Sequence, residues 1–143
     1  MNLPPELFVD TSFLIALLNS NDEYHQQAVA LQSLLSETSL RKISSEYILI
    51  ELGDGLSRLR FRQLAGRLIH LIGQDPSFEV ISASPKLFTN AVTLFNSRPD
   101  KEWGLTDCTS IVIMQERGLD TVLSADRHFL QAGLRALLLE SLQ

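Results

Sequence analysis

The sequence predicts an α/β protein in which helices cover both faces of a parallel sheet. Short apolar segments alternate with longer segments of helical periodicity along the chain, which is the pattern of a parallel sheet. The 143 residues, of which 45% are hydrophobic and 20% are charged, are enough for a domain with its own core. Neither an internal repeat nor a linker rich in Gly, Pro or Ser divides the chain. We therefore expect a single domain over residues 1–143.

The first half of the chain begins with a short apolar strand at residues 7–10, after which Thr11 or Ser12 is suited to cap a helix. A second helix opens near Asn21 and Asp22, because apolar residues follow at helical spacing. The other elements expected here are a strand at 42–44 and helices at 45–59 and 61–72.

The second half continues the alternation. Pro85 suits the first turn of a helix that runs to about Phe95. Thr106 is expected to cap a further helix that reaches Arg117 and ends at Gly118, the residue that most readily adopts a left-handed helix end. The other elements expected here are strands at 78–81, 121–123 and 135–139 and a short helix at 128–132.

Several protein classes are disfavoured by composition. The longest apolar run, residues 13–18, is far shorter than the ~20 residues of a membrane helix. The N-terminus lacks the basic start and apolar stretch of a signal peptide. The lone Cys108 excludes an internal disulfide and suits a reducing compartment. We therefore expect a cytoplasmic protein with no membrane association.

The charge distribution leaves two interpretations open. A net charge of −5 disfavours binding of nucleic acid by bulk electrostatics. The segment 55–74 nevertheless contains no acidic residue and four arginines, namely Arg58, Arg60, Arg62 and Arg67. These arginines form either a local patch that contacts nucleic acid or a solvated face on which a protein partner docks. The sequence favours the two about equally.

Four acidic residues, Asp10, Glu51, Asp107 and Asp126, each interrupt an apolar segment. A carboxylate beside a buried element is costly unless a cation or hydrogen bonds compensate its charge. Each of the three aspartates also has an ordinary explanation: Asp10 and Asp126 as caps or turn residues, and Asp107 as an acid favoured by the dipole of a helix first turn. Together they indicate one shared cation site, because ligands in α/β proteins gather at the carboxyl ends of the strands.

Glu51 lies at the margin of an apolar helix face. That face comprises Ile48, Leu52, Leu56 and Leu59. At ~100° per residue Glu51 falls about 60° from Ile48, so its side chain is able to face a cleft. Glu46 projects to the opposite side and is expected in solvent. Alternatively, Glu51 forms a salt bridge in solvent at the edge of this apolar face.

A set of four carboxylates suits divalent-metal chemistry. Mg²⁺ prefers hard oxygen ligands, and two ions about 3.5–4 Å apart are able to activate a water and stabilise a leaving oxygen. Without metal, four neighbouring carboxylates would repel one another and titrate with raised pKa values. The set therefore predicts a magnesium or manganese centre for phosphodiester hydrolysis.

Five segments of this chain resemble the PIN-domain family, and in particular its VapC-like ribonuclease toxins. The resemblance lies in residues 8–17, in the spacing of Asp22, His25 and Ala28, and in residues 44–51, 105–108 and 123–129. Each motif is short, but all four acidic motifs occur in the family's order. The resemblance covers nearly the whole chain.

The resemblance implies a three-layer α/β/α sandwich with a central parallel sheet. It implies that Asp10, Glu51, Asp107 and Asp126 are the catalytic ligands of Mg²⁺ or Mn²⁺ and that RNA, single-stranded or structured, is the substrate. It also implies a cognate antitoxin protein whose tail occupies the acidic cleft, and a homodimer. We further expect substrate contacts from Thr11, Ser12, Arg58 and Arg60. Structural roles are expected for His25 and His128, and solvated positions for Asp22, Asp54 and Asp100.

Other functions fit the residues less well. A haloacid dehalogenase-type phosphatase needs a second aspartate two positions after the first, where this chain has Ser12. A receiver domain needs a pair of acids and a late lysine that the sequence lacks in the required places. A PIN fold that binds RNA or protein without cutting it is the main alternative, and metal binding distinguishes it. A DNA-directed nuclease would use the same metal chemistry.

Overall fold

Five parallel strands form one sheet in the computed structural model, which describes residues 1–140. The strand order is β3-β2-β1-β4-β5, so β1 lies at the centre. The strands are β1 (Glu6–Val9), β2 (Arg41–Ser45), β3 (Phe78–Ile81), β4 (Thr121–Leu123) and β5 (Arg135–Ala136). The predicted parallel sheet is confirmed.

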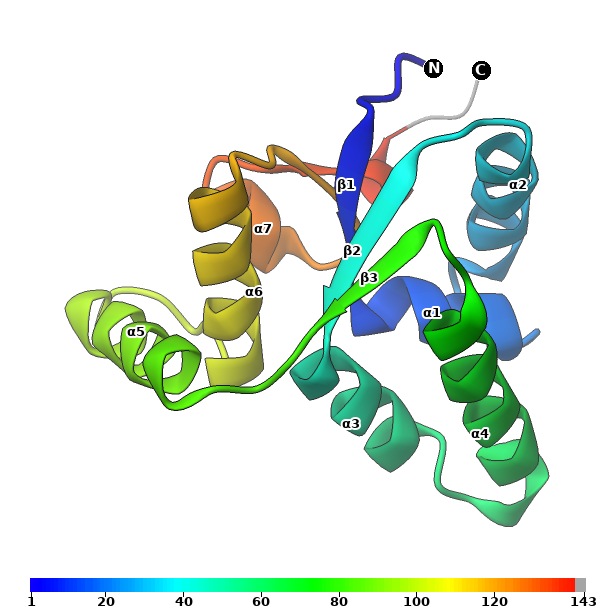
Figure 1. Cartoon of the computed structure of the whole chain (residues 1–143), viewed down its shortest axis with the longest axis horizontal. Coiled ribbons are helices and arrows are strands. Elements are labelled where there is room, and N and C mark those ends of the chain that lie inside the picture. The colour runs from blue at the N-terminus through cyan, green and yellow to red at the C-terminus, as the bar shows by residue number, and fades with distance from the viewer. Residues whose placement is uncertain (141–143) are drawn as a thin grey trace.

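Helices cover both faces of this sheet. They are α1 (Thr11–Leu18), α2 (His25–Ser36), α3 (Glu46–Gly55), α4 (Leu59–Gln74), α5 (Pro85–Ser97), α6 (Leu105–Arg117) and α7 (Arg127–Gln131), followed by a 3₁₀ turn at Leu137–Leu139. Figure 1 shows α1, α2 and α4 on one side of the sheet and α5, α6 and α7 on the other. The three-layer sandwich predicted from the sequence is therefore confirmed.

The central strand is buried because it has helices on both faces. Leu7, Phe8 and Val9 are almost completely inaccessible to solvent, which explains why these three residues of β1 are all apolar rather than alternating with polar ones. Phe8 is paired with Ile43 on one side and with Val122 on the other. This pairing brings the ends of β1 and β4 together and thereby positions the site described below.

Three helix starts differ from the sequence prediction. Asp10, not Thr11 or Ser12, caps α1. The second helix begins at His25 rather than near Asn21 and Asp22, because the preceding residues form turns, with the His25 amide donating to the Asp22 carbonyl. Gly104 precedes the first residue of α6, so Thr106 lies inside that helix. In each case the sequence offers a short polar side chain that is able to form local hydrogen bonds either as a helix cap or in a turn, so the helix start was misplaced.

Two further boundaries also differ. The helix predicted at 45–59 ends at Gly55. Leu59 was predicted to share an apolar face with Ile48 and Leu52, but it is 93% exposed at the start of α4. The last predicted strand pairs only over Arg135–Ala136 and continues as a 3₁₀ turn. Within residues 1–140, no helix combines the length and apolar character needed to cross a membrane.

Candidate active site

Four predicted carboxylates, those of Asp10, Glu51, Asp107 and Asp126, border one hollow at the carboxyl edge of the sheet. The hollow has a volume of about 560 Å³. It is lined by Asp10, Thr11, Ser12, Ile15, Glu51, Asp54, Gly55, Asp107 and Asp126, and we call it the acidic hollow. Its place follows from the topology, because β1 and β4 are adjacent parallel strands whose carboxyl ends meet at the same edge.

Asp10 is the most buried of the four, with 5% of its surface exposed. Its Oδ2 accepts hydrogen bonds from Ser124 Oγ at 2.7 Å and from Ser12 Oγ at 2.9 Å. The two hydroxyls in turn accept from the backbone of the loop after β4, Ser12 from the Ala125 amide and Ser124 from the Asp126 amide, both at 3.0 Å. Asp10 is thus held against the loop that carries Asp126.

Burial dominates the electrostatics of Asp10. It raises the pKa of this carboxyl to about 6, and the hydrogen bonds from Ser124 and Ser12 offset part of the shift. A carboxylate in this position is stabilised by any cation that enters the hollow, because the cation replaces the lost hydration.

Glu51 approaches the hollow from α3. Its Oε1 accepts a hydrogen bond from the Thr11 hydroxyl at 2.5 Å, which ties α3 to the first residue of α1. Glu51 itself is exposed, whereas Thr11 is buried. Asp54, one turn further along α3, also lines the hollow, although it was expected to be an unrelated solvated acid. The spacing of three residues from Glu51 is the sequence signal that would have identified it.

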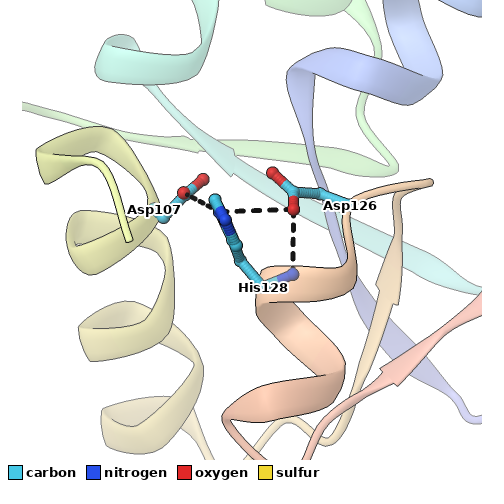
Figure 2. Close-up of side chains that lie close together, drawn as sticks. All are labelled: Asp107, Asp126 and His128. Carbon is cyan, nitrogen blue, oxygen red and sulfur yellow. Dashed lines mark hydrogen bonds and ion pairs between the residues drawn. The ribbon is translucent and has the colours of Figure 1, made fainter. Parts of the chain in front are cut away.

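Asp107 and Asp126 lie on either side of the imidazole of His128, as Figure 2 shows. His128 Nδ1 is 2.8 Å from Asp107 Oδ2 and 3.3 Å from Asp126 Oδ1. Asp126 Oδ1 also accepts from the His128 amide at 2.8 Å and so caps α7, while Asp107 Oδ2 accepts from the Gly104 amide at 3.1 Å. Both aspartates therefore perform the ordinary capping role and also face the hollow.

His128 is a residue of the site that sequence reasoning missed. The sequence predicts only a structural role for it, beside Phe129, which is fully buried. The signal in the sequence is its position two residues after Asp126. A carboxylate that caps a helix is close to both the backbone amide and the side chain of the residue two positions later. Burial lowers the pKa of His128, but the hydrogen bond to Asp107 and the charge of Asp126 outweigh it, and the pKa is raised. Burial, and then the charge of Asp126, raise the pKa of Asp107.

The four carboxylates share a simple pattern. Each uses one oxygen for hydrogen bonds within the protein: Oδ2 of Asp10, Oε1 of Glu51, Oδ2 of Asp107 and Oδ1 of Asp126. Within residues 1–140, no protein hydrogen bond reaches the second oxygen of any of them. Ligand atoms of Asp107, Asp126 and His128 also lie within 4.8 Å of one another. Hard oxygen donors in this number suit Mg²⁺ or Mn²⁺.

The remaining predicted residues fall into two groups. Thr11 and Ser12 line the acidic hollow, where their hydroxyls hold Glu51 and Asp10. Arg58 and Arg60 do not line it; both are exposed at the start of α4, and Arg60 lies over the Phe61 ring. His25 has the structural role expected of it, since its Nδ1 contacts the Ala16 carbonyl at 2.7 Å.

The family model of the PIN domain matches residues 7–134 of the chain. No curated protein sequence matches it significantly.

Three solved structures have a similar fold. VapC20 of Mycobacterium tuberculosis, described as a toxin that cleaves the sarcin-ricin loop, is 25% identical with a TM-score of 0.78, covering 90% of this chain and 95% of VapC20. FitAcB of Neisseria gonorrhoeae is 18% identical with a TM-score of 0.65, covering 91% and 95%. VapBC-1 of nontypeable Haemophilus influenzae is 14% identical with a TM-score of 0.60, covering 92% and 96%. The last two show similarity of fold alone.

Proposed function

Because this chain belongs to the PIN domain family, we propose that it is a metal-dependent endoribonuclease and the toxin of a toxin–antitoxin pair. One observation carries the proposal. The acidic hollow is bordered by four carboxylates from four different elements, each with one oxygen held by the protein and one left for a ligand. A purely structural set of acids would have no reason to converge at the ligand-binding edge of a parallel sheet.

Asp10, Glu51, Asp107 and Asp126 would hold Mg²⁺ or Mn²⁺. A bound ion would lower the pKa of a coordinated water and stabilise the charge on the leaving oxygen of a phosphodiester. The protein's own part is to keep these oxygens oriented. Ser12 and Ser124 hold Asp10 through its Oδ2, and Thr11 holds Glu51 through its Oε1. His128 donates to Asp107 or Asp126 when it is protonated, and so offsets their mutual repulsion.

RNA, single-stranded or structured, is the proposed substrate. The similarity to VapC20, described as cleaving the sarcin-ricin loop, supports RNA over DNA. Thr11 and Ser12 are proposed to contact the substrate in the hollow. Arg58 and Arg60 are proposed to contact its phosphates further from the cut, because they lie outside the hollow.

The proposed protein partners are a cognate antitoxin and a second copy of the chain. The similarity to a solved toxin supports the first. An antitoxin segment with basic residues would match the charge of the acidic hollow. For the homodimer, the outer face of α5 offers an apolar surface, since Phe88 and Phe95 are 49% and 47% exposed and lie two helical turns apart. We also propose that residues 1–143 form one domain that works in the cytoplasm.

The test is cleavage of a mixed single-stranded RNA by purified, antitoxin-free protein. We expect cleavage with Mn²⁺, none with EDTA, and a rate roughly 10²- to 10⁴-fold lower for Asp10→Asn, because a metal ligand contributes several kcal/mol to transition-state stabilisation. Circular dichroism should show that Asp10→Asn remains folded. Equal activity of the wild-type and Asp10→Asn proteins would refute the assignment of the site.

Failure to cleave under any condition, in a folded sample, would favour the non-catalytic alternative. Calorimetry with Mn²⁺ then decides. A binding module has no need for the carboxylates to hold an ion, so the absence of Mn²⁺ binding would support it, whereas tight binding would indicate a nuclease of narrow substrate selectivity.

A further inference from the structure

A second hollow of about 310 Å³ adjoins the acidic hollow. It is lined by Ser12, Ile15, Asp22, Glu23, Tyr24, Ala125 and Asp126, and we call it the side hollow. Ser12, Ile15 and Asp126 belong to both hollows, so the two meet along this shared wall. A group seated in the side hollow is therefore an immediate neighbour of any phosphate bound at the carboxylates.

The lining of the side hollow suits a base better than a phosphate. Asp22, Glu23 and Asp126 supply carboxylates, and its lining includes no lysine or arginine, so a phosphate would be repelled. Tyr24 supplies an aromatic ring, and Ile15 adds an apolar wall. Proteins that bind single-stranded RNA commonly stack a base on an aromatic side chain and read its edge by hydrogen bonds.

The loop that carries these residues is held in place before any ligand binds. The Tyr24 amide donates to Asp22 Oδ1 at 2.8 Å, and the Asp22 amide donates to the Asn19 carbonyl at 3.0 Å. At the start of α2, the contact of His25 Nδ1 with the Ala16 carbonyl ties the loop to α1. Tyr24 is half-buried and packs against the core. Such preorganisation reduces the entropic cost of binding.

We propose that the side hollow seats one nucleobase of the substrate RNA, next to the scissile phosphate, with Tyr24 stacking on the base and Glu23 selecting guanine. This proposal rests on the proposed ribonuclease function. Guanine is favoured because its Watson–Crick edge presents two adjacent N–H donors, which match the two acceptor oxygens of a carboxylate. Uracil presents one donor between two carbonyl oxygens, which a carboxylate repels. Asp22 contributes less, since one of its oxygens already accepts from Tyr24.

The test measures binding of fluorescein-labelled uridine heptamers with G, A, C or U at the central position. Fluorescence anisotropy with the Asp10→Asn protein separates binding from cleavage. We expect the heptamer with guanine to bind most tightly. Adding Tyr24→Leu, which keeps an apolar side chain but removes the aromatic face, should weaken its binding about 5- to 150-fold, whereas Tyr24→Phe should not. Glu23→Gln should reduce the preference for guanine, because it weakens binding of the guanine heptamer and removes the carboxylate that repels uracil.

Gln26→Ala is the matched control, because Gln26 is exposed on α2 beside these residues but does not line the side hollow. Equal binding of the four heptamers, or equal effects of Tyr24→Leu and Gln26→Ala, would overturn the proposal. Cleavage of the same heptamers by the wild-type protein with Mn²⁺ tests the nuclease separately. Cleavage without base preference refutes the base site alone. Base preference without cleavage leaves the base site standing, and the Mn²⁺ calorimetry described above then decides whether the protein is a nuclease.

Discussion

Opposite charges gather at two places in this protein, the acidic hollow and helix α4. The carboxylates of the hollow come from four elements that are distant in sequence, and they are linked by hydrogen bonds to Ser12, Ser124, Thr11 and His128. The arginines of α4 lie on one helix or at its cap, and all are exposed. No ion pair formed within residues 1–140 includes Arg58, Arg60, Arg62 or Arg67.

The two regions therefore differ in what their charge costs. Burying the carboxylate of Asp10 opposes folding unless a cation is present, and its pKa is raised mainly by this burial and to a lesser degree by the charge of Asp107. Exposed arginines retain their hydration, so α4 carries its charge at little cost to stability. Charged residues whose burial destabilises the fold, such as Asp10, are the better indicator of a functional site. Exposed charged residues that cost little stability, such as the arginines of α4, are compatible with several roles. The predictions below test this difference.

The largest effect we expect concerns the pH dependence of the metal-free protein. The pKa of Asp10 is about 6 in the folded state against a model value of 3.8. The folded state binds this proton more tightly, so stability falls as the pH rises from about 4 to about 6. The contribution of Asp10 to the free energy of unfolding should fall by about 3 kcal/mol over its whole titration, and by about 2 kcal/mol between pH 4 and pH 6.

Urea unfolding in EDTA at a series of pH values measures this change. Asp10→Asn is the control because it cannot titrate, and the difference between the two proteins removes the contribution of carboxyls such as Glu79, whose pKa is lowered by Arg117. Parallel pH profiles for the two proteins would show that Asp10 carries no such cost.

The next effect concerns the residue that holds Asp10. Ser124→Ala removes a hydroxyl that donates to Asp10 and accepts from the Asp126 amide. We expect Mn²⁺ affinity and cleavage to decrease about 10- to 100-fold, as for other residues that orient metal ligands. Calorimetry and the cleavage assay measure the two quantities. Ser33→Ala on the exposed face of α2 is the control, and equal behaviour of the two variants would mean that Ser124 orients nothing.

A smaller effect is expected on α4. Arg60 and Arg67 lie two helical turns apart on the same exposed face. If both contact phosphates, their replacement by alanine should reduce the slope of log Kd against log salt by about 1.4, since each contact with a single strand contributes about 0.7. Filter binding of RNA to the Asp10→Asn protein at several salt concentrations gives this slope. An unchanged slope would favour the other interpretation of α4, a surface on which a protein docks.

The smallest effect is expected for Glu46, the other glutamate of α3. Its Oε1 accepts from the Ala83 amide at 2.7 Å, away from the acidic hollow. Glu46→Gln keeps a carbonyl oxygen for this bond, so we expect the stability to change by less than about 0.5 kcal/mol and cleavage to stay the same. Thermal unfolding and the cleavage assay measure both. A large loss of cleavage would mean that the site has been assigned to the wrong glutamate.

The contrast between Glu46 and Glu51 also shows how much the sequence revealed. Helical periodicity placed Glu51 at the margin of a buried face, although it wrongly included Leu59 in that face. The error has a local cause: Leu56 and Leu59 have suitable spacing, but the chain leaves the helix at Gly55 and begins α4 at Leu59. Helical periodicity indicates which side chains lie on an apolar face, but it does not indicate at which residue the helix ends.

Residues of the site were missed for a related reason. In the sequence, Asp54 is predicted to be a solvated acid and His128 a structural residue, and Tyr24 falls within the second predicted helix. The spacing of Asp54 from Glu51 and of His128 from Asp126 is a signal in the sequence. The folded chain is needed to show that Asp54 lines the acidic hollow, that Tyr24 lines the side hollow and that His128 lies between two aspartates. Nothing in the spacing of Asp107 and His128, which lie 21 positions apart, indicates a contact of 2.8 Å.

By itself, the sequence determined the order and type of the main elements and the four acidic residues at their ends or margins. Local periodicity, and the cost of a carboxylate beside an apolar segment, can both be recognised along one chain. Tertiary structure alone decided which oxygen of each carboxylate is held and which is left for a ligand. Ser124 and Asp10 are 114 positions apart and meet only because β1 and β4 pair side by side. Pairing between strands depends on contacts across the whole domain, and no local pattern encodes it.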